Sequence, residues 1–338
     1  MKVTIYTECP TKDYFNALYH LKDINIELID SRFLRSLLVK ILKRKDSWKN
    51  IWKSFIAPFT LPFKDNIIIS FAPYHSRIFY IILLKILKKR MIYHTSWPYW
   101  KDKYVHKPFL FSKKLWMNFL NKMPTIAVSA KAELELNNLG AKAVQIPHGI
   151  DTEIFKDLKI KKDKFTVLFV GRLVEEKGIR DLLELSKELS NINFVFAGSG
   201  PLEKEINKYP VKYLGFIKDK KRLASVYNQA DLFVLNSYKT NNWEELYGIV
   251  LLEAMSCGLP VIATDCVGPK EIIQNQKTGI LIPQKDKTAL KKAILDLKEN
   301  KSKREKLSSN AKQFVVKNYN IGRISNKWFN LLNSVFKK

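Results

Sequence analysis

The stretch EELYGIVLLEAMSCGLPVIATD, residues 244–265, joins a predicted helix to a predicted strand. Apolar residues at helical spacing fill 249–257, and after Gly258 the short apolar run 260–265 is typical of a buried strand. Glu253 stands inside this apolar helix, and a carboxylate buried without a partner costs several kcal/mol. Glu253 therefore either points to solvent, pairs with a lysine, or receives hydrogen bonds from the hydroxyl groups of a ligand.

The same alternation of short strands and periodic helices continues on both sides of this stretch. It predicts a parallel sheet covered by helices on both faces, and therefore an α/β domain. In the C-terminal half the predicted strands are 165–171, 192–198, 231–237 and 260–265, and the predicted helices are 179–189, 223–230 and 249–257. In the N-terminal half the predicted strands are 2–7, 25–30, 66–71, 90–95, 124–129 and 143–149, with longer basic helices between them.

A polar stretch over 150–164 separates the two halves and marks the predicted domain boundary. We expect an N-terminal domain over 1–150 and a C-terminal domain over 151–320. The tail 321–338 is predicted to be an amphipathic helix that packs back on the N-terminal domain.

Composition narrows the class of protein. The chain has 338 residues and a net charge of +27, so its surface attracts phosphates, acidic lipids or nucleic acid. Its three cysteines, Cys9, Cys257 and Cys266, lack the spacing of a zinc site or a disulfide framework, which favours reduced buried thiols and an intracellular location. The N-terminus is interpreted as a first strand, not a signal peptide, and the longest apolar run, 78–84, is far shorter than the roughly 20 residues that span a bilayer.

Two loops that follow predicted strands have the composition of phosphate-binding loops. The first, 171–178, holds Arg172 and Lys177 before a helix N-terminus, which suits a diphosphate, although a solvated basic turn has the same composition. The second, 197–202, has small residues that let a ligand approach the backbone, although a tight turn needs them too. In a parallel sheet the loops after these strands and before residue 249 all lie along one edge, where α/β folds bind ligands.

Several segments together resemble the glycosyltransferase family 4 signature in order and spacing. They are IPHGID (146–151), FVGRLVEEKG (169–178), AGSGP (197–201), YLGFI (213–217) and the stretch 244–265. The resemblance implies the GT-B architecture, with two Rossmann-like parallel-sheet domains facing across a cleft. It also implies sugar transfer from a nucleotide donor with retention of anomeric configuration. The N-terminal half matches only in outline.

The resemblance implies roles for individual residues. Arg172 and Lys177 look like the pair that neutralises the donor diphosphate as the leaving group departs. Glu253 corresponds to the glutamate that accepts hydrogen bonds from the ribose, and Glu245 to the glutamate near the donor sugar. The other donor-binding positions are Gly171, Gly198, Gly200, Phe216 beside the nucleobase, and Tyr247, Gly248 and Ile249 beside sugar and phosphate.

The acceptor end of the site is less well defined by the sequence. His94 occupies roughly the place of the family's N-domain histidine near the reacting sugar, or it is a satisfied core residue. Its neighbours Trp97, Tyr99 and Trp100 form a sugar platform or pack in the core. His148 replaces a common asparagine, and the segment 7–15 lacks the glycine-rich loop that often follows the first strand. The Asp-x-Asp metal signature is absent from the sequence, so no metal is expected.

Basic amphipathic segments predict where the positive charge acts. Residues 31–55 combine a regular apolar stripe with many Lys and Arg residues, as in a helix lying on an anionic membrane surface, and 83–90 repeats the pattern. The alternative is an ordinary helix packed on the N-terminal sheet. Membrane contact would make a lipid or lipid-linked glycan at the cytoplasmic membrane face the expected acceptor, with a donor of UDP or GDP type.

Two other functional classes fit parts of the sequence. A nucleotide-sugar epimerase or hydrolase of the same architecture would need no sugar acceptor. A nucleic-acid-binding protein is suggested by the charge alone, without a recognised binding motif, so no nucleic acid is expected as a partner.

Overall fold

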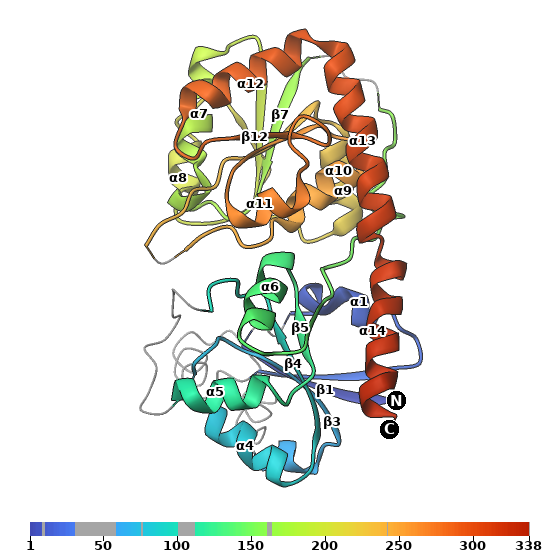
Figure 1. Cartoon of the computed structure of the whole chain (residues 1–338). Coiled ribbons are helices and arrows are strands. Elements are labelled where there is room, and N and C mark those ends of the chain that lie inside the picture. The colour runs from blue at the N-terminus through green and yellow to red at the C-terminus, as the bar shows by residue number, and fades with distance from the viewer. Residues whose placement is uncertain are drawn as a thin grey trace. The chain divides into compact units, whose positions relative to one another are not determined.

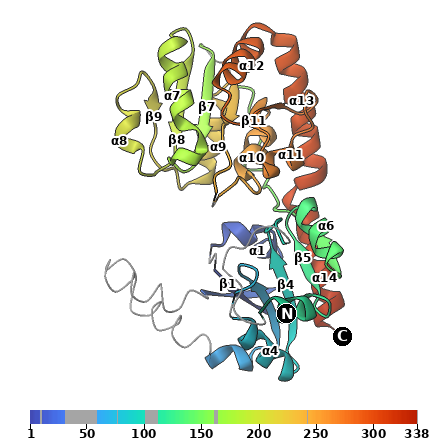
Figure 2. The same ribbon diagram turned by 60° about the vertical axis from the view of Figure 1, so that its left-hand side comes forward.

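The computed structural model describes residues 1–8, 11–30, 59–75, 77–100, 112–160, 164–241 and 243–337. Within these ranges the chain forms two compact units, one of Met1–Gly149 with Ile321–Lys338 and one of Ile150–Asn320. Each unit contains a sheet of six strands in the described residues, and all the strand pairs are parallel. Figures 1 and 2 show each sheet between layers of helices. The predicted α/β class with two Rossmann-like parallel sheets is confirmed.

The N-terminal unit has the strand order β2-β1-β3-β4-β5-β6. Its strands are β1 Lys2–Thr7, β2 Asn25–Asp30, β3 Asn66–Ser70, β4 Arg90–Thr95, β5 Thr125–Ala127 and β6 Ala143–Gln145. Its helices are α1 Asn16–Tyr19, α4 Ile78–Ile86, α5 Ser112–Leu120, α6 Ala130–Asn138 and α14 Ile321–Phe336, with the short 3₁₀ turns η1 Asp13–Phe15 and η2 Leu61–Phe63.

The last two strands of this unit are shorter than predicted. β5 ends early because Ser129 caps the following helix, its hydroxyl accepting a hydrogen bond from the Ala132 N–H at 3.2 Å. β6 ends two residues before Pro147, which has no N–H for a ladder hydrogen bond.

Helix α14 packs on the N-terminal unit, against α1 and β4. Its buried side is formed by Ile324, Trp328, Leu332 and Phe336, in one cluster with Ile68 and Ile92 of the sheet. The Ser325 hydroxyl donates to the Ala17 carbonyl at 2.7 Å. The chain thus returns from the second unit to complete the core of the first.

The C-terminal unit has the strand order β12-β11-β10-β7-β8-β9. Its strands are β7 Thr166–Val170, β8 Asn193–Ala197, β9 Lys212–Tyr213, β10 Leu232–Leu235, β11 Val261–Thr264 and β12 Ile280–Ile282. Its helices are α7 Ile179–Glu188, α8 Glu203–Ile206, α9 Lys220–Asn228, α10 Ile249–Ser256, α11 Val267–Ile272, α12 Lys287–Glu299 and α13 Lys301–Tyr319, with the 3₁₀ turn η3 Glu175–Lys177.

The elements from β12 to α13 were not among the sequence predictions. α13 is 19 residues long but buries only a sparse stripe, Leu307, Ala311 and Val315, so its sequence shows little apolar periodicity. The short elements α8, β9 and α11 were also not predicted, whereas every strand and helix that was predicted in the C-terminal half is present.

Strand order decides where this unit can bind a ligand. From β7 the chain steps outward through β8 to β9, then returns to β10 on the other side of β7. Such a reversal leaves a crevice outside the carboxyl ends of the two central strands. The loop 171–178 follows β7 and the loop 236–248 follows β10, so both lie at this reversal.

The structure describes only some of the residues on which the predictions about thiols and membrane contact depend. Cys257 and Cys266 are buried and not in disulfides, and burial raises the pKa of the Cys266 thiol to about 11. Cys9 and the predicted basic helix 31–55 lie outside the described residues. Among the helices that the structure describes, none is both long and apolar enough to cross a membrane.

Candidate functional site

The two predicted phosphate-type loops form one continuous surface. The Gly171 N–H donates to the Ala197 carbonyl at 3.0 Å, and the Leu173 N–H donates to the Ser199 carbonyl at 2.9 Å. A Cβ atom at Gly198 would lie 1.8 Å from the Gly171 carbonyl oxygen, so only glycine permits this approach. The small residues after β8 therefore serve loop-to-loop packing, whatever else they bind.

A pocket of about 270 Å³ opens at this surface. Its walls come from the loops after β7 and β8, the segment after β9 and the first turns of α10. Five predicted site residues line it: Gly171, Arg172, Gly198, Phe216 and Glu253. Tertiary structure thus brings together residues separated by up to about 80 positions in one concave site of the kind that holds a small ligand.

Glu253 has a partner that the sequence analysis missed. The Tyr227 hydroxyl, on α9, donates to Glu253 Oε2 at 2.9 Å. Tyr227 is fully buried, and burial followed by the nearby Glu253 charge raises its pKa well above the usual value, so its hydroxyl keeps its proton. The hydrogen bond from the buried Tyr227 therefore orients the Glu253 carboxylate, and the Glu253 side chain also lines the pocket. An aromatic residue with a polar tip in the helix before β10 was the available signal.

The loops after β7 and β10 are joined by an ion pair. Lys177 Nζ contacts Glu245 Oε2, and the two side chains are only 10% and 12% exposed. The Ser237 hydroxyl donates to the same carboxylate oxygen at 3.3 Å. The predicted cation and the earlier glutamate of the pair are thus direct partners.

Arg172 has a different environment from Lys177. Its side chain is 60% exposed, and its Nη2 lies 3.9 Å from Glu176 Oε1. Of the two predicted diphosphate-binding cations, Lys177 is therefore buried and paired, whereas Arg172 is largely exposed and lines the pocket.

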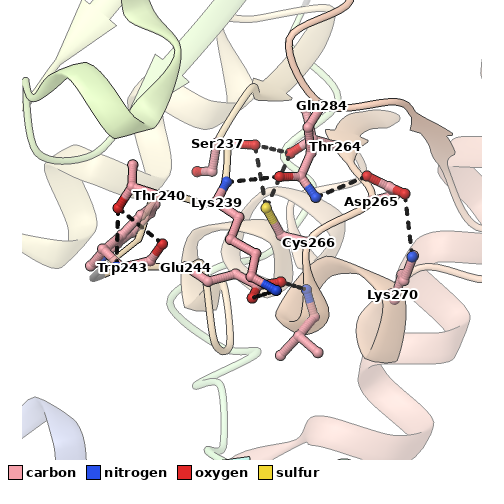
Figure 3. A network of polar contacts seen from close by, with 11 residues as sticks. Ser237, Lys239, Thr240, Trp243, Glu244, Thr264, Asp265, Cys266, Lys270 and Gln284 are labelled. Carbon is pink, nitrogen blue, oxygen red and sulfur yellow. Dashed lines mark hydrogen bonds and ion pairs between the residues drawn. The ribbon is translucent and has the colours of Figure 1, made fainter. Parts of the chain in front are cut away.

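The loop that carries Glu245 is fixed to the segment after β11. The Gly268 N–H donates to the Glu245 carbonyl at 2.9 Å, and the Val267 N–H donates to Glu244 Oε1 at 3.0 Å. Figure 3 shows how Gln284 bridges the two sides, accepting from the Lys239 N–H at 2.7 Å and donating to Asp265 at 3.1 Å.

This network holds the entry to α10. Tyr247 precedes Gly248, and Gly248 has φ +81° as the residue before the helix, so Ile249 opens α10. The three predicted residues thus lie at a helix N-terminus, where free backbone N–H groups favour an anion.

His94 lies at the end of β4 and is buried in the N-terminal unit. Its Nδ1 lies 3.1 Å from the Ser70 hydroxyl, and its ring packs against Tyr14, Phe15 and Trp328. Burial, followed by the nearby His148, lowers the pKa of His94 to about 3, and burial lowers that of His148 to about 4. These contacts favour the satisfied-core alternative for His94.

The aromatic residues after β4 differ in their exposure. Trp100 is fully buried in the core, which confirms the core-packing alternative for this residue. Trp97 is partly buried, and its indole N–H donates to the Tyr99 carbonyl at 3.0 Å. The Tyr99 ring lies 4.6 Å from Lys131 Nζ.

Glu8 forms a polar cluster at the carboxyl end of β1 that the sequence analysis did not find. Its carboxylate accepts from Arg77 Nη1 at 2.6 Å and from the Ala72 N–H at 3.0 Å, with His75 Nε2 at 3.9 Å. The available signal was a charged residue directly after the first strand. The sequence analysis interpreted this segment, 7–15, only by its lack of a glycine-rich loop.

Residues 150–314 match the family described as Glycosyl transferases group 1. The matched residues lie within the C-terminal unit. The match spans β7 to most of α13 and so includes every predicted donor-site residue. The finer assignment to glycosyltransferase family 4 stays a prediction.

Relatives of the group 1 domain include an uncharacterized glycosyltransferase, MJ1178, of Methanocaldococcus jannaschii. It is 32% identical over 204 residues, which cover 58% of this chain and 56% of that protein. Alpha-D-kanosaminyltransferase of Streptomyces kanamyceticus is 30% identical over 171 residues, 47% of this chain and 43% of that protein. The chain spans about half the length of the curated relatives it matches.

A solved structure extends the similarity to both units. The structure of Anabaena Alr3699/HepE in complex with UDP has a TM-score of 0.72 and covers 99% of this chain and 100% of that one at 17% identity. This similarity confirms the predicted GT-B fold.

Proposed function

We propose that the chain is a retaining glycosyltransferase of the family 4 type. It moves a hexose-type sugar from a nucleoside-diphosphate donor to a glycan or lipid-linked acceptor. One observation carries the proposal: in a group 1 domain, a single pocket gathers Arg172, Gly198, Phe216 and the oriented carboxylate of Glu253.

The donor-binding roles follow from the chemistry of these groups. Glu253, held by Tyr227, accepts hydrogen bonds from the ribose hydroxyls, and Phe216 lies beside the base. Arg172, Lys177 and the N–H groups that open α10 stabilise the diphosphate and the negative charge that grows on it during transfer. Glu245 holds Lys177 and lies near the donor sugar.

These cations supply the charge neutralisation that a metal gives in other transferases, so we propose that no metal is required. Transfer activity is then unchanged by EDTA. Activity that is lost on chelation and restored by Mg²⁺ or Mn²⁺ would contradict this part of the proposal.

The choice of nucleotide starts from a structural neighbour. Anabaena Alr3699/HepE has been solved in complex with UDP-glucose as well as UDP. We therefore place UDP-sugars first among the donors to be tested, with GDP-sugars second.

The surface of α4 supports a membrane-bound acceptor. Ile86, at the end of α4, is 71% exposed, and Phe79 and Leu83 of the same helix are also exposed. The exposed residues Lys85 and Lys88 lie beside them. An apolar face edged by lysines suits the interface of an anionic bilayer, so we propose peripheral attachment at the inner face of the cell membrane.

The test is thermal unfolding of the purified protein with UDP-, GDP- and ADP-sugars, because a ligand that binds only the folded state raises the midpoint. We expect one nucleotide class to raise it, and Glu253→Ala to abolish the shift. Glu299→Ala, an exposed acid on α12, is the matched control and should keep it.

Donor turnover then separates the enzyme classes. Sugar transfer that requires an added glycan or lipid-linked acceptor supports the proposal. Release of nucleotide or conversion of the sugar without any acceptor would instead identify a hydrolase or epimerase.

A further inference from the structure

Trp243 lies between the two cations of the candidate site. It belongs to the loop after β10, two residues before Glu245. Its ring centroid is 5.1 Å from Lys177 Nζ and 6.0 Å from Arg172 Cζ. One aromatic ring is therefore in cation–π range of both groups that are assigned to the diphosphate.

The backbone on which this ring stands is fixed. The Trp243 N–H donates to the Thr240 hydroxyl at 3.1 Å, and the Thr240 N–H donates to the Trp243 carbonyl at 2.8 Å. Figure 3 shows the Thr240 hydroxyl in contact with the backbone of Trp243, with Glu244 next in the chain. Glu244 in turn accepts from the Val267 N–H, so the chain is fixed at Trp243 and at the residue after it.

The charges around the ring are unequal. Lys177 has a buried carboxylate partner in Glu245, whereas Arg172 is exposed and has Glu176 at 3.9 Å. Two cations that share one site repel each other, and the negative face of an indole attracts both. Arg172 therefore depends on the ring more than Lys177 does to stay directed at the pocket.

We propose that Trp243 is a positioning residue that holds Arg172 and Lys177 toward a common anion. The inference rests on the proposed function in one respect, that this anion is the diphosphate of the donor. Without the ring, Arg172 turns toward Glu176 and Lys177 stays with Glu245, so the site loses affinity for a diphosphate more than for a monophosphate.

The experiment is isothermal titration calorimetry of the full chain with UDP, UMP and inorganic pyrophosphate. For Trp243→Ala we expect affinity for UDP and pyrophosphate to fall by about tenfold, with less than about threefold for UMP. Trp243→Phe keeps an aromatic face and recovers most of the loss. Tyr209→Ala is the matched control, because its partly buried ring carries Lys187 at 4.1 Å in the same unit but outside the candidate site, and it should leave all three affinities unchanged.

Two results would overturn the proposal. The first is unchanged affinity for UDP and pyrophosphate in Trp243→Ala. The second is an equal loss of affinity for UMP, because Trp243 would then be only a wall of the pocket without a role specific to the diphosphate. If Trp243→Ala does not fold, Trp243→Leu and Trp243→Phe decide, since only Phe should keep the preference for diphosphate. If the wild type binds pyrophosphate but no uridine nucleotide, the choice of uridine fails and pyrophosphate alone still tests Trp243. If it binds neither, both fail.

Discussion

The two sheets share an architecture but differ at the carboxyl ends of their strands. In the C-terminal unit, glycine loops pack backbone to backbone after β7 and β8 and leave a pocket of about 270 Å³ whose lining includes the charged residues Arg172 and Glu253. In the N-terminal unit, the end of β4 is filled by His94 and by rings from η1 and α14. The same strand layout therefore gives an open pocket where glycine loops follow the strands and a sealed aromatic cluster where large rings pack over the strand ends.

Among the changes that would distinguish the two units, Lys177→Ala is expected to have the largest effect. It removes positive charge from the diphosphate site and leaves Glu245 buried without its partner. We expect transfer to slow by about a hundredfold or more and unfolding free energy to fall by about 3 kcal/mol. Steady-state kinetics and urea unfolding measure the two effects.

The double variant Lys177→Ala/Glu245→Ala is the control for Lys177→Ala. It should recover part of the stability but none of the activity, because the unpaired carboxylate is removed while the cation is still missing. Near-normal turnover in the single variant would take Lys177 out of the mechanism.

Gly198→Ala tests the packing of the two loops. The new methyl group would meet the Gly171 carbonyl, so the loops must separate, at a cost of about 2 kcal/mol or more and with loss of nucleotide binding. Gly215→Ala is the comparison: its φ of +69° makes alanine unfavourable by about 1 kcal/mol, but nothing lies within 4 Å of the added group. Equal effects of the two changes on nucleotide binding would contradict loop contact as the cause.

Acid should destabilise the N-terminal unit, because two buried histidines with lowered pKa values, His94 and His148, belong to it. Burial holds the pKa of His94 at about 3 and that of His148 at about 4, below the value of about 6.5 in the unfolded chain. The unfolded state then binds more protons, so stability present above pH 6.5 is lost as pH falls toward 4. Each histidine contributes about 1.4 kcal/mol per pH unit in this window.

Unfolding midpoints measured from pH 7 to pH 4 test this expectation. His94→Gln and His148→Asn together should flatten the profile, although both variants are expected to be less stable at pH 7. A profile that keeps its full slope in the double variant would assign the acid sensitivity to other groups.

Tyr227→Phe has the smallest expected effect. It removes one hydrogen bond to Glu253 and keeps the ring, so affinity for the nucleotide should fall by about fivefold. Tyr93→Phe is the matched change in the other unit, where the lost bond is to the Phe71 carbonyl at 2.9 Å, and it should reduce stability without changing nucleotide affinity. Calorimetric titration of both variants makes the comparison.

The sequence by itself predicted ten of the twelve strands in the described residues, all but β9 and β12, and the helices α7, α9, α10 and α14. Strands 2–7, 25–30 and 90–95 were predicted with the bounds that the structure has, because short β-rich apolar runs between turns have few other ways to be buried. It also determined which loops carry the candidate site, since the carboxyl ends of parallel strands share one edge. α13 escaped prediction because three buried residues in 19 leave too weak a pattern.

Only the tertiary structure decided the partners. Lys177 and Glu245 are 68 residues apart in the sequence, and Tyr227 and Glu253 are 26 residues apart. No local sequence pattern predicts either contact. His94 lies among the rings of Tyr14, Phe15 and Trp328, which come from segments far from it in the chain. The physical reason is that local periodicity fixes which face of an element is buried, whereas hydrogen bonding, ion pairing and pKa depend on what the rest of the chain packs against that face.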